Sequence, residues 1–582
     1  MPTAGNRRAR LLSLLLVFSC CLVLAGCSRV DYVEGNGKPR FPVPVLPTNV
    51  GALPTLPALA NTPSWDEFKS GIQAAIDYGT KSGVVTNHAR LDAIVKALSK
   101  ANHDDPAVKV VMKYVLLLAT DEAQSLPPIA PSGDAAGAGT LTWKPCEADG
   151  LQCASLKIPL DYTKPSGASV DIKMDRYPAR KTDQHIGVLM ANPGGPGGSG
   201  LDFLPAWYSG LSDELKDRFD IVSFDPRGVG QSDPFVCGKP KSPGDTSPNP
   251  KTPAEEAAYT SLAKSYGDAC DTIDPQMLQN IGTKNVALDM DEMRKAMGED
   301  KITYLGYSYG TEIGQVYANM FPDHVRAFVL DGVVDPGLTK QQLSTAQTAA
   351  FDNALSRFAK SCPKVCTGLA QYVVQQSGKN QIDSKYLGSS DYVDPNYADT
   401  AISAMLYSKS RWPLLAWALR EAAVDKDGTL LALAVDSYSG RSIFTGESSS
   451  NGDDSFIAIM CRDFATSSLP DAYRMSRTSN RLHPIFASNP DVLCNEWPSQ
   501  PDVIGPVTWP KSVPVLLVST TGDPATPHKL AQNVAARNPS AVLLTHDGDG
   551  HTAYSSGDNC IDAKVDQFLI DVKVPKKGTV CK

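Results

Sequence analysis

The sequence predicts an α/β fold with a mostly parallel sheet. From residue 141 onward, short apolar stretches alternate with amphipathic stretches of helical spacing, which is typical of strand–helix–strand units. The 582 residues are 42% hydrophobic and 20% charged, within the globular range. The net charge is −8, and no basic stripe is interleaved with aromatic residues. We therefore expect no nucleic-acid partner.

Residues 1–26 have the pattern of a lipoprotein signal peptide. Three arginines at positions 7, 8 and 10 precede an uncharged apolar run over residues 11–26, which is short for a membrane span. The run closes with Leu24-Ala25-Gly26-Cys27, which resembles a bacterial lipobox in which Cys27 would carry the lipid. Ordinary signal cleavage with an incidental cysteine is the alternative. We expect an exported protein, lipid-anchored to the outer face of the bacterial cell membrane or released from the cell.

Two further segments precede the predicted core. Residues 27–63 are rich in proline and are expected to form an extended tether. Residues 64–140 are expected to form a helical extension and a linker, because apolar residues have helical spacing and Ser64 and Glu67 have the spacing of a capping box. This extension could shield a cleft, act as a pro-segment or space the protein from the membrane.

The predicted core is divided by a long helical insertion. Its first part covers residues 141–336 and its last part residues 511–582. Residues 337–510 separate two successive strands with a mostly helical pattern, which is too long for a loop, so we expect a cap domain over the strand ends. Strands are expected at residues 170–177, 186–191, 220–224, 302–306, 327–330, 514–520 and 541–545.

The cysteines after residue 27 agree with export. They are ten in number, an even count that predicts five disulfides in an oxidising compartment. Zinc binding is the alternative, but no Cys-x-x-Cys pair exists in the sequence, so no metal is expected. Pairing of nearest neighbours gives Cys146–Cys153, Cys237–Cys270, Cys362–Cys366, Cys461–Cys494 and Cys560–Cys581.

Ser308 is the candidate nucleophile. It is the serine of a Gly-x-Ser-x-Gly sequence, Gly306 to Gly310, that follows an apolar strand and opens a helix. The pentapeptide alone is common by chance. In this context, however, glycines permit a sharp turn that exposes the serine oxygen, and the helix N-terminus directs backbone N–H groups toward a developing anion.

A serine nucleophile needs a base and an acid, which follow it in the chain in this type of fold. His551 lies on a glycine-containing loop directly after a predicted strand, and Asp523 ends the strand before that one. A carboxylate in this place can orient the imidazole and stabilise its charged form. Asp331, at the end of another strand, is the alternative acid.

The third expected part is an oxyanion hole. Residues 192–200 contain five glycines directly after an apolar strand, which lets the backbone approach a substrate carbonyl closely. One N–H should come from this loop and one from Tyr309. A phosphate-binding loop is the alternative, but the Gly-x-x-x-x-Gly-Lys-Ser/Thr pattern is absent from the sequence.

Five motifs occur together in the order of a known family. They are residues 192–200, Asp225 to Ser232, residues 306–310, residues 523–526 and residues 548–551. In these motifs the chain resembles the α/β-hydrolase peptidases related to prolyl aminopeptidase, and most of all the bacterial secreted tripeptidyl aminopeptidases. The resemblance extends over about residues 141–582, although the segment before residue 141 is longer than the family core and the cap is the least similar part.

The resemblance implies an α/β-hydrolase fold, with the cap inserted before the strand that carries the acid. It also implies a catalytic Ser308, Asp523 and His551, an oxyanion hole at Gly195 and Tyr309, and cleavage of short peptides from a free N-terminus. The implied partner is thus a peptide or protein N-terminus, and no cofactor is implied. An esterase or lipase on the same three residues is one alternative. A surface-binding lipoprotein without activity is another.

An enzyme that cuts near a free N-terminus must bind the ammonium group, which needs a carboxylate in the cap. Asp463 is the candidate, because it lies two residues after the predicted disulfide cysteine Cys461 and its backbone should be fixed. Glu447 and Glu496 are alternatives. An acidic residue without a role is also compatible with the sequence.

Overall fold

The computed structural model describes the chain from residue 61 to residue 582 with internal gaps. The predicted signal peptide, Cys27 and the tether up to residue 60 lie outside the described residues, as does Glu447. In the described ranges, no helix combines the length and the apolar character needed to cross a bilayer. The described residues are 61–124, 141–146, 150–238, 250, 252–362, 366, 368–379, 381–387, 393–446, 451–486 and 489–582.

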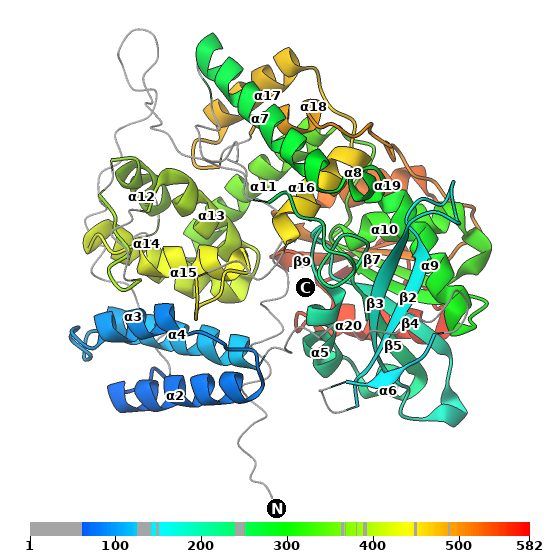
Figure 1. Ribbon diagram of the computed structural model, residues 1–582, viewed down its shortest axis with the longest axis horizontal. Helices are drawn as coiled ribbons and strands as arrows, with labels where there is room; N and C mark the ends of the chain where they lie inside the picture. Colours follow the sequence, from blue (N-terminus) through cyan, green and yellow to red (C-terminus); the bar gives the residue numbers. More distant parts are fainter. Residues whose placement is uncertain are drawn as a thin grey trace, which may run out of the picture.

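The described strands form one sheet in the order β1-β2-β3-β5-β4-β6-β7-β8-β9-β10 (Figure 1). Every neighbouring pair from β5 to β10 is parallel, whereas β1, β2 and β3 join antiparallel at one edge. The strands are β1 (Lys144–Pro145), β2 (Gln152–Pro159), β3 (Ser169–Tyr177), β4 (Gly187–Asn192), β5 (Phe219–Phe224), β6 (Ile302–Tyr307), β7 (Val325–Asp331), β8 (Val515–Gly522), β9 (Val542–Asp549) and β10 (Val580–Cys581). All the predicted strands are present, as β3 to β9.

Helices cover both faces of the sheet. One face packs against α5 (Gly200–Gly210), α6 (Asp213–Arg218) and α20 (Asn559–Asp571). The other face packs against α9 (Thr283–Met297), α10 (Gly310–Met320) and α19 (His528–Arg537). This three-layer arrangement buries the parallel strands on both faces, and their ends remain as the place where a site can form.

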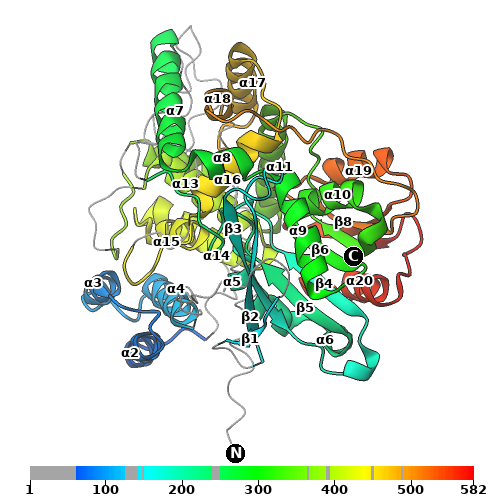
Figure 2. The ribbon, with the colours of Figure 1, turned by 45° about the vertical axis from the view of Figure 1, so that its right-hand side comes forward.

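The insertion between β7 and β8 is helical, as predicted. Its helices are α11 (Lys340–Ser361), α12 (Leu369–Ser377), α13 (Pro395–Leu406), α14 (Trp412–Val424), α15 (Thr429–Tyr438), α16 (Gly452–Asp463), α17 (Leu469–Leu482) and α18 (Val492–Asn495). Helices α16 and α18 share a hydrophobic core with the sheet. Figure 2 shows α17 projecting away from the sheet beside α7 (Pro253–Ile273). Helix α7 belongs to the segment after β5 and is followed by α8 (Pro275–Asn280). The Tyr473 hydroxyl of α17 donates to the Glu256 carbonyl of α7 at 3.0 Å.

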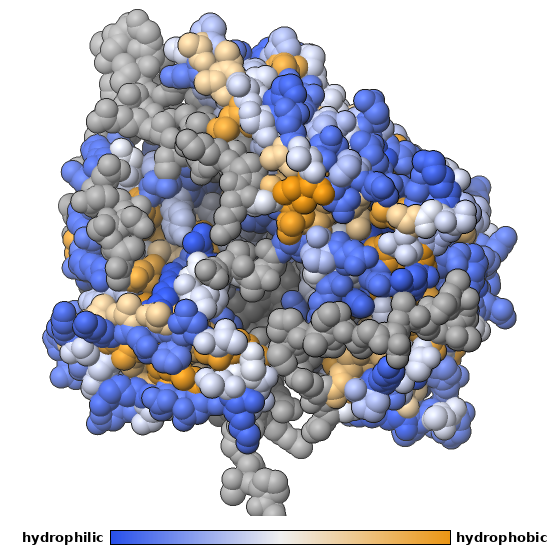
Figure 3. Space-filling model, viewed as in Figure 1, coloured by the Kyte–Doolittle hydropathy of each residue, from blue (hydrophilic) through white to orange (hydrophobic). Residues whose placement is uncertain are grey.

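The N-terminal extension packs against the insertion. It consists of α2 (Trp65–Lys81), α3 (Ala89–Leu98) and α4 (Pro106–Ala123), which lie beside α14 and α15 in Figure 1. The predicted capping box is present, since the Ser64 N–H donates to Glu67 and the Glu67 N–H donates to the Ser64 hydroxyl. The extension and helices α11 to α15 contribute to one hydrophobic core. On the face in Figure 3, most of the described surface is hydrophilic, as expected for a cluster that turns its apolar side chains inward.

Buried polar contacts also join the extension to the insertion. The carboxylate of Asp436 on α15 binds Arg90 of α3 and accepts a hydrogen bond from the Tyr397 hydroxyl at 3.2 Å. The carboxylate of Glu122 on α4 accepts the Ile443 N–H at 2.7 Å. A segment that shares a core and buried charges with the insertion is part of the same folded unit.

The structure forms the five expected disulfides. Cys461–Cys494 joins α16 to α18, Cys237–Cys270 joins the loop after β5 to α7, and Cys560–Cys581 joins α20 to β10. Two clusters with the spacing of metal ligands occur among the described residues, but each consists of an aspartate and one of these bonded cysteine pairs. Their sulfur atoms are therefore not available as thiolates.

Replacement of Arg90 by Met should destabilise the protein by about 3 kcal/mol, because it leaves the nearly buried Asp436 carboxylate with less compensation. Lys69→Met is the matched control, since Lys69 pairs with Asp66 on the exposed side of the same extension and should change stability by less than about 1 kcal/mol. Urea unfolding measures both. Equal, small effects would show that the extension does not depend on Asp436.

Candidate active site

Ser308 occupies the sharp turn between β6 and α10. Its backbone has φ of +53°, a left-handed conformation that is uncommon for residues other than glycine. The Ser308 N–H donates to the Asp331 carbonyl of the neighbouring strand β7 at 2.9 Å. The turn also needs glycine at position 306, where a Cβ would lie 2.3 Å from the Gly310 carbonyl oxygen. The predicted nucleophile thus stands on a strained turn beyond the end of a central strand.

His551 and Asp523 form a hydrogen-bonded pair. The His551 Nδ1 lies 2.9 Å from each carboxylate oxygen of Asp523, and the two side chains are 3% and 0% exposed. Asp523 directly follows β8, and His551 follows β9 after Gly550; the two strands are adjacent and parallel. The carboxylate can therefore fix the tautomer and the orientation of the imidazole, as predicted from the sequence.

The imidazole lies over the strand end next to Ser308. Tyr307 and Asp331 are in register in the β6–β7 pair, so Gly332 follows at the level of Ser308. The His551 Cε1 is 3.0 Å from the position of a Cβ on Gly332. The structure thus gathers the predicted nucleophile, base and acid at the carboxyl edge of the sheet, beyond the ends of β6, β9 and β8.

Thr526 supports the acid and was not predicted. The Thr526 N–H donates to Asp523 at 2.8 Å and its hydroxyl donates at 2.9 Å, while the Ala525 N–H donates at 2.9 Å. The threonine oxygen is also 3.3 Å from the His551 Nδ1. The sequence signal is Asp-x-x-Thr, in which an aspartate folds back on the two backbone N–H groups that follow it.

Asp331, the alternative acid, binds backbone instead of the imidazole. Its Oδ2 accepts the N–H groups of Ala553 and Tyr554 at 2.9 and 2.8 Å. Burial raises the pKa of Asp331 to about 6. This carboxyl group therefore holds the loop that carries His551, and Asp523 is the residue in contact with the ring.

The insertion also contacts the imidazole-bearing loop. The Tyr407 carbonyl, just after α13, accepts the His551 N–H at 2.8 Å. The Tyr407 ring packs edge-on against the imidazole with ring centres 5.4 Å apart. No pattern in the sequence predicts this contact, because residues 407 and 551 are joined only by the folding of the cap onto the core.

The glycine loop after β4 lies against the nucleophile turn. Gly194 has φ of +92°, and a Cβ there would be 2.9 Å from the Tyr309 backbone nitrogen and 3.0 Å from the Ser308 Cβ. The Gly194 N–H donates to the Asn192 side chain at 2.9 Å, and Gly195 is the next residue. Both predicted sources of oxyanion N–H groups, Gly195 and Tyr309, therefore belong to segments in direct contact beside Ser308.

Asp225, the first residue of the motif over residues 225–232, has a structural role. Its carboxylate accepts the Ser199 hydroxyl at 2.7 Å, the Leu201 N–H at 3.2 Å and the Gln231 N–H at 2.7 Å. Burial raises the pKa of Asp225 to about 6. Because Ser199 and Leu201 lie at the start of α5, this residue ties the glycine loop to the loop after β5.

Asp463 does not fit the predicted role of an ammonium anchor. The residue is 1% exposed at the end of α16, and its Oδ1 accepts the Thr283 N–H at 3.0 Å while its Oδ2 accepts the Thr283 hydroxyl at 2.7 Å. Burial raises the pKa of Asp463 to about 7. A carboxylate enclosed in this way and already bonded to the start of α9 cannot meet a substrate ammonium, which corrects the prediction. For Glu496, the alternative candidate, binding of the substrate ammonium stays a prediction.

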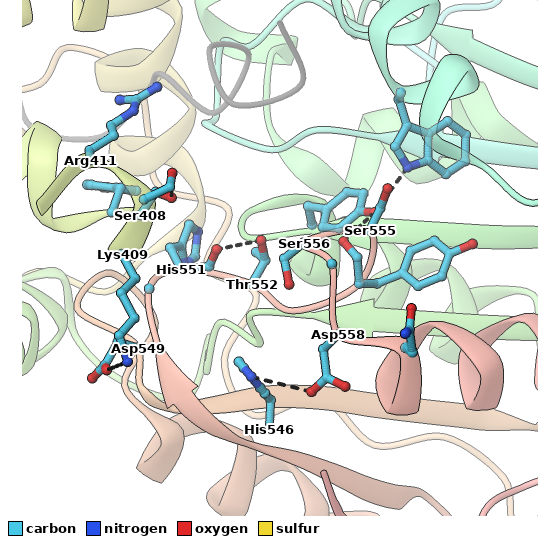
Figure 4. A pocket seen from close by; sticks show the side chains of 18 of the residues that line it. Ser408, Lys409, Arg411, His546, Asp549, His551, Thr552, Ser555, Ser556 and Asp558 are labelled. Atoms are coloured by element: carbon cyan, nitrogen blue, oxygen red, sulfur yellow. Dashed lines mark hydrogen bonds and ion pairs between the residues drawn. The ribbon is translucent and has the colours of Figure 1, made fainter. Parts of the chain in front are cut away.

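A cavity of about 760 Å³ adjoins His551. It lies where residues 407–411 of the insertion face residues 546–560 of the core (Figure 4). The cation of Lys409 reaches across to Asp549 at 2.8 Å, and His546 lies 3.4 Å from Asp558. The cavity is thus lined by cap and core together, with the imidazole on its wall.

Comparisons with known proteins give relatives over most of the chain. A family model described as TAP-like protein matches residues 483–581. The chain is 34% identical to serine protease Hip1 of Mycobacterium tuberculosis over 482 residues, which covers 76% of this chain and 91% of that protein. It is 35% identical to carboxylesterase B of the same organism over 512 residues, with 78% and 94% covered. It is 32% identical to the tripeptidyl aminopeptidase of Streptomyces lividans over 481 residues, with 77% and 87% covered.

The two candidate acids can be separated by matched substitutions. Asp523→Asn should lower kcat for a peptide or ester probe by about 10⁴, because an amide no longer holds the required imidazole tautomer. Asp331→Asn should keep kcat within about tenfold of the parent, because an amide oxygen can still accept the Ala553 and Tyr554 N–H groups. Steady-state kinetics on both variants tests this. A larger loss in Asp331→Asn than in Asp523→Asn would reverse the assignment.

Proposed function

The chain belongs to the α/β-hydrolase family that includes serine protease Hip1 and the tripeptidyl aminopeptidases, and we propose that it is an exported serine peptidase that releases short peptides from free N-termini. The protein is thus a serine hydrolase of the aminopeptidase-like type. The observation that carries the proposal is the His551–Asp523 pair at the strand ends beside the Ser308 turn.

The first chemical step is acylation of the serine. The Ser308 oxygen attacks the scissile carbonyl carbon while the His551 Nε2 takes its proton. Asp523 keeps the other ring nitrogen protonated and stabilises the imidazolium that forms. Thr526 and Ala525 saturate the Asp523 carboxylate with hydrogen bonds, so the acid stays in one orientation during the transfer.

The negative charge then develops on the former carbonyl oxygen. Backbone N–H groups of Gly195 and Tyr309 hold this oxyanion, and their rigid segments need no rearrangement during reaction. When the C–N bond breaks, His551 gives its proton to the leaving amine. Water, activated by the same imidazole, then hydrolyses the ester on Ser308 and restores the enzyme.

Ester hydrolysis is the second candidate function. The observation that favours it is the similarity to carboxylesterase B, which is as high as the similarity to Hip1. The same nucleophile and oxyanion hole can process either leaving group, so the fold does not decide between them. Two of the three relatives are named as peptidases, which supports the peptide substrate.

The proposed location is the outer face of the cell membrane, with a lipid on Cys27. The lipobox-like sequence Leu24 to Cys27 supports the anchor. The five cysteine pairs support an oxidising compartment, because disulfides of this kind are rare in the cytosol. A surface-binding lipoprotein without activity is disfavoured by the geometry of the Asp523–His551 pair, which a protein of that type does not need.

A library of short peptides with free or acetylated N-termini tests the proposed function, with mass spectrometry of the products. The enzyme should cleave free peptides a fixed short distance from the N-terminus and acetylated ones at least about tenfold more slowly, since a charge-assisted contact to the ammonium contributes roughly 1.5–3 kcal/mol. Ser308→Ala should remove cleavage, whereas Ser408→Ala, a serine on the cavity wall, should not. Equal cleavage of both peptide sets would refute the exopeptidase, and turnover of esters alone would favour the esterase.

A further inference from the structure

The side chain of Tyr309 is held by a chain of buried hydroxyl groups. Tyr309 follows the nucleophile in sequence, is 3% exposed, and its hydroxyl is hydrogen-bonded to the Thr283 hydroxyl. The Thr283 hydroxyl donates its proton to the Asp463 Oδ2 at 2.7 Å. Tyr309 must therefore be the donor toward Thr283, because a hydroxyl has one proton. The bonds run in one direction, from Tyr309 through Thr283 to Asp463.

The end of this chain is fixed in the cap. Asp463 is the last residue of α16, and its carbonyl accepts the Ile504 N–H at 2.9 Å. Two residues earlier, Cys461 is bonded to Cys494. The Thr283 backbone N–H also donates to the Asp463 carboxylate, which places the first residue of α9. The Asp463 carboxylate thus binds the first residue of α9 directly and, through Thr283, is joined to Tyr309, the residue before α10.

A second buried acid lies beside the first. Glu312 is on the first turn of α10 and is fully buried, and neither of its carboxyl oxygens has a hydrogen-bond partner within the described residues. Asp463, in contrast, accepts hydrogen bonds from Thr283. Burial, with the nearby Asp463 charge, raises the pKa of Glu312 well above its usual value. The negative charge of this pair therefore belongs on Asp463, where it can accept.

We propose that Asp463 is a positioning residue, which acts through Thr283 to hold Tyr309 so that its backbone N–H points at the oxyanion. This inference rests on the proposed catalytic role of Ser308 and Tyr309. The direction of a backbone N–H depends on the peptide plane between residues 308 and 309, and an anchored side chain restricts rotation of that plane. An oxyanion donor is effective only when it is already aimed before the charge develops.

Thr283→Val is the most direct test, because valine has the same shape and removes only the bridging hydroxyl. We expect kcat to fall about tenfold with little change in KM, since an oxyanion donor acts mainly in the transition state. Thr283→Ser keeps the hydroxyl and should restore kcat. Tyr309→Phe should have an effect similar to Thr283→Val, and the double variant should be no slower than either single variant, since both break one chain.

Tyr317→Phe is the matched control. Tyr317 lies on α10 and is fully buried. Its hydroxyl donates a hydrogen bond to Asp291 at 3.2 Å, away from Ser308. Loss of the Tyr317 hydroxyl should leave kcat within about twofold of the parent. Melting temperatures, and active sites counted by phosphonate titration, correct all rates for any loss of folded protein. An unchanged kcat in Thr283→Val, no recovery in Thr283→Ser, or an equal loss in Tyr317→Phe would overturn the proposal.

The rates are measured with a peptide and with a small acyl ester, since both need the same oxyanion hole. If the parent enzyme hydrolyses only the ester, the proposed peptidase function fails while the Thr283 comparison still tests Asp463. If the parent neither hydrolyses a probe nor reacts with the phosphonate, both proposals fail. A loss confined to the peptide, with the ester rate unchanged, would place Asp463 in substrate binding and contradict the positioning role.

Discussion

Close backbone packing between the β6–α10 turn and the glycine loop is the constraint on which the site depends. The turn holds Ser308 in a left-handed conformation, and the loop passes so near that a side chain at Gly194 would collide with the turn. These segments follow adjacent strands β6 and β4 of the parallel sheet. The sheet therefore sets the distance between the nucleophile and the backbone groups that would receive the oxyanion.

Buried carboxyl groups then hold the loops around this turn. Asp523, Asp331, Asp225 and Asp463 each accept at least one backbone N–H, and each lies in a different segment. Only Asp523 contacts the imidazole. Unpaired buried carboxylates are costly, but hydrogen bonds from backbone N–H groups offset part of that cost and fix the loop geometry. The acids that a sequence survey finds near a nucleophile are thus mostly structural, and their partners decide which one can assist catalysis.

Much of the core could be predicted because its signals are local. Strands β4 to β8 are mostly apolar runs, Ser308 and Asp523 follow such runs directly, and His551 lies just beyond β9, so their placement at one edge follows from a parallel sheet. The strands β1 and β10 have two residues each and are defined only by their pairing with the neighbouring strand, so no sequence pattern marks them. Strand β2 lies at the antiparallel edge of the sheet, and its apolar and polar residues alternate only weakly. The contacts of Tyr407 with His551, Arg90 with Asp436 and Asp463 with Thr283 join distant parts of the chain and leave no pattern in the sequence. For this reason the sequence alone predicts a substrate contact for Asp463, whereas the structure shows it bound to Thr283 at the start of α9.

Mapping the adduct of a peptidyl phosphonate shows directly whether Ser308 is the nucleophile and His551 its base. Such a probe forms a bond only to a serine activated by its base and facing the oxyanion donors. After reaction, proteolysis and mass spectrometry, we expect one modified peptide, with the phosphonate on Ser308, and no modification when His551 is replaced by alanine. Modification of another serine, or undiminished labelling without His551, would contradict it.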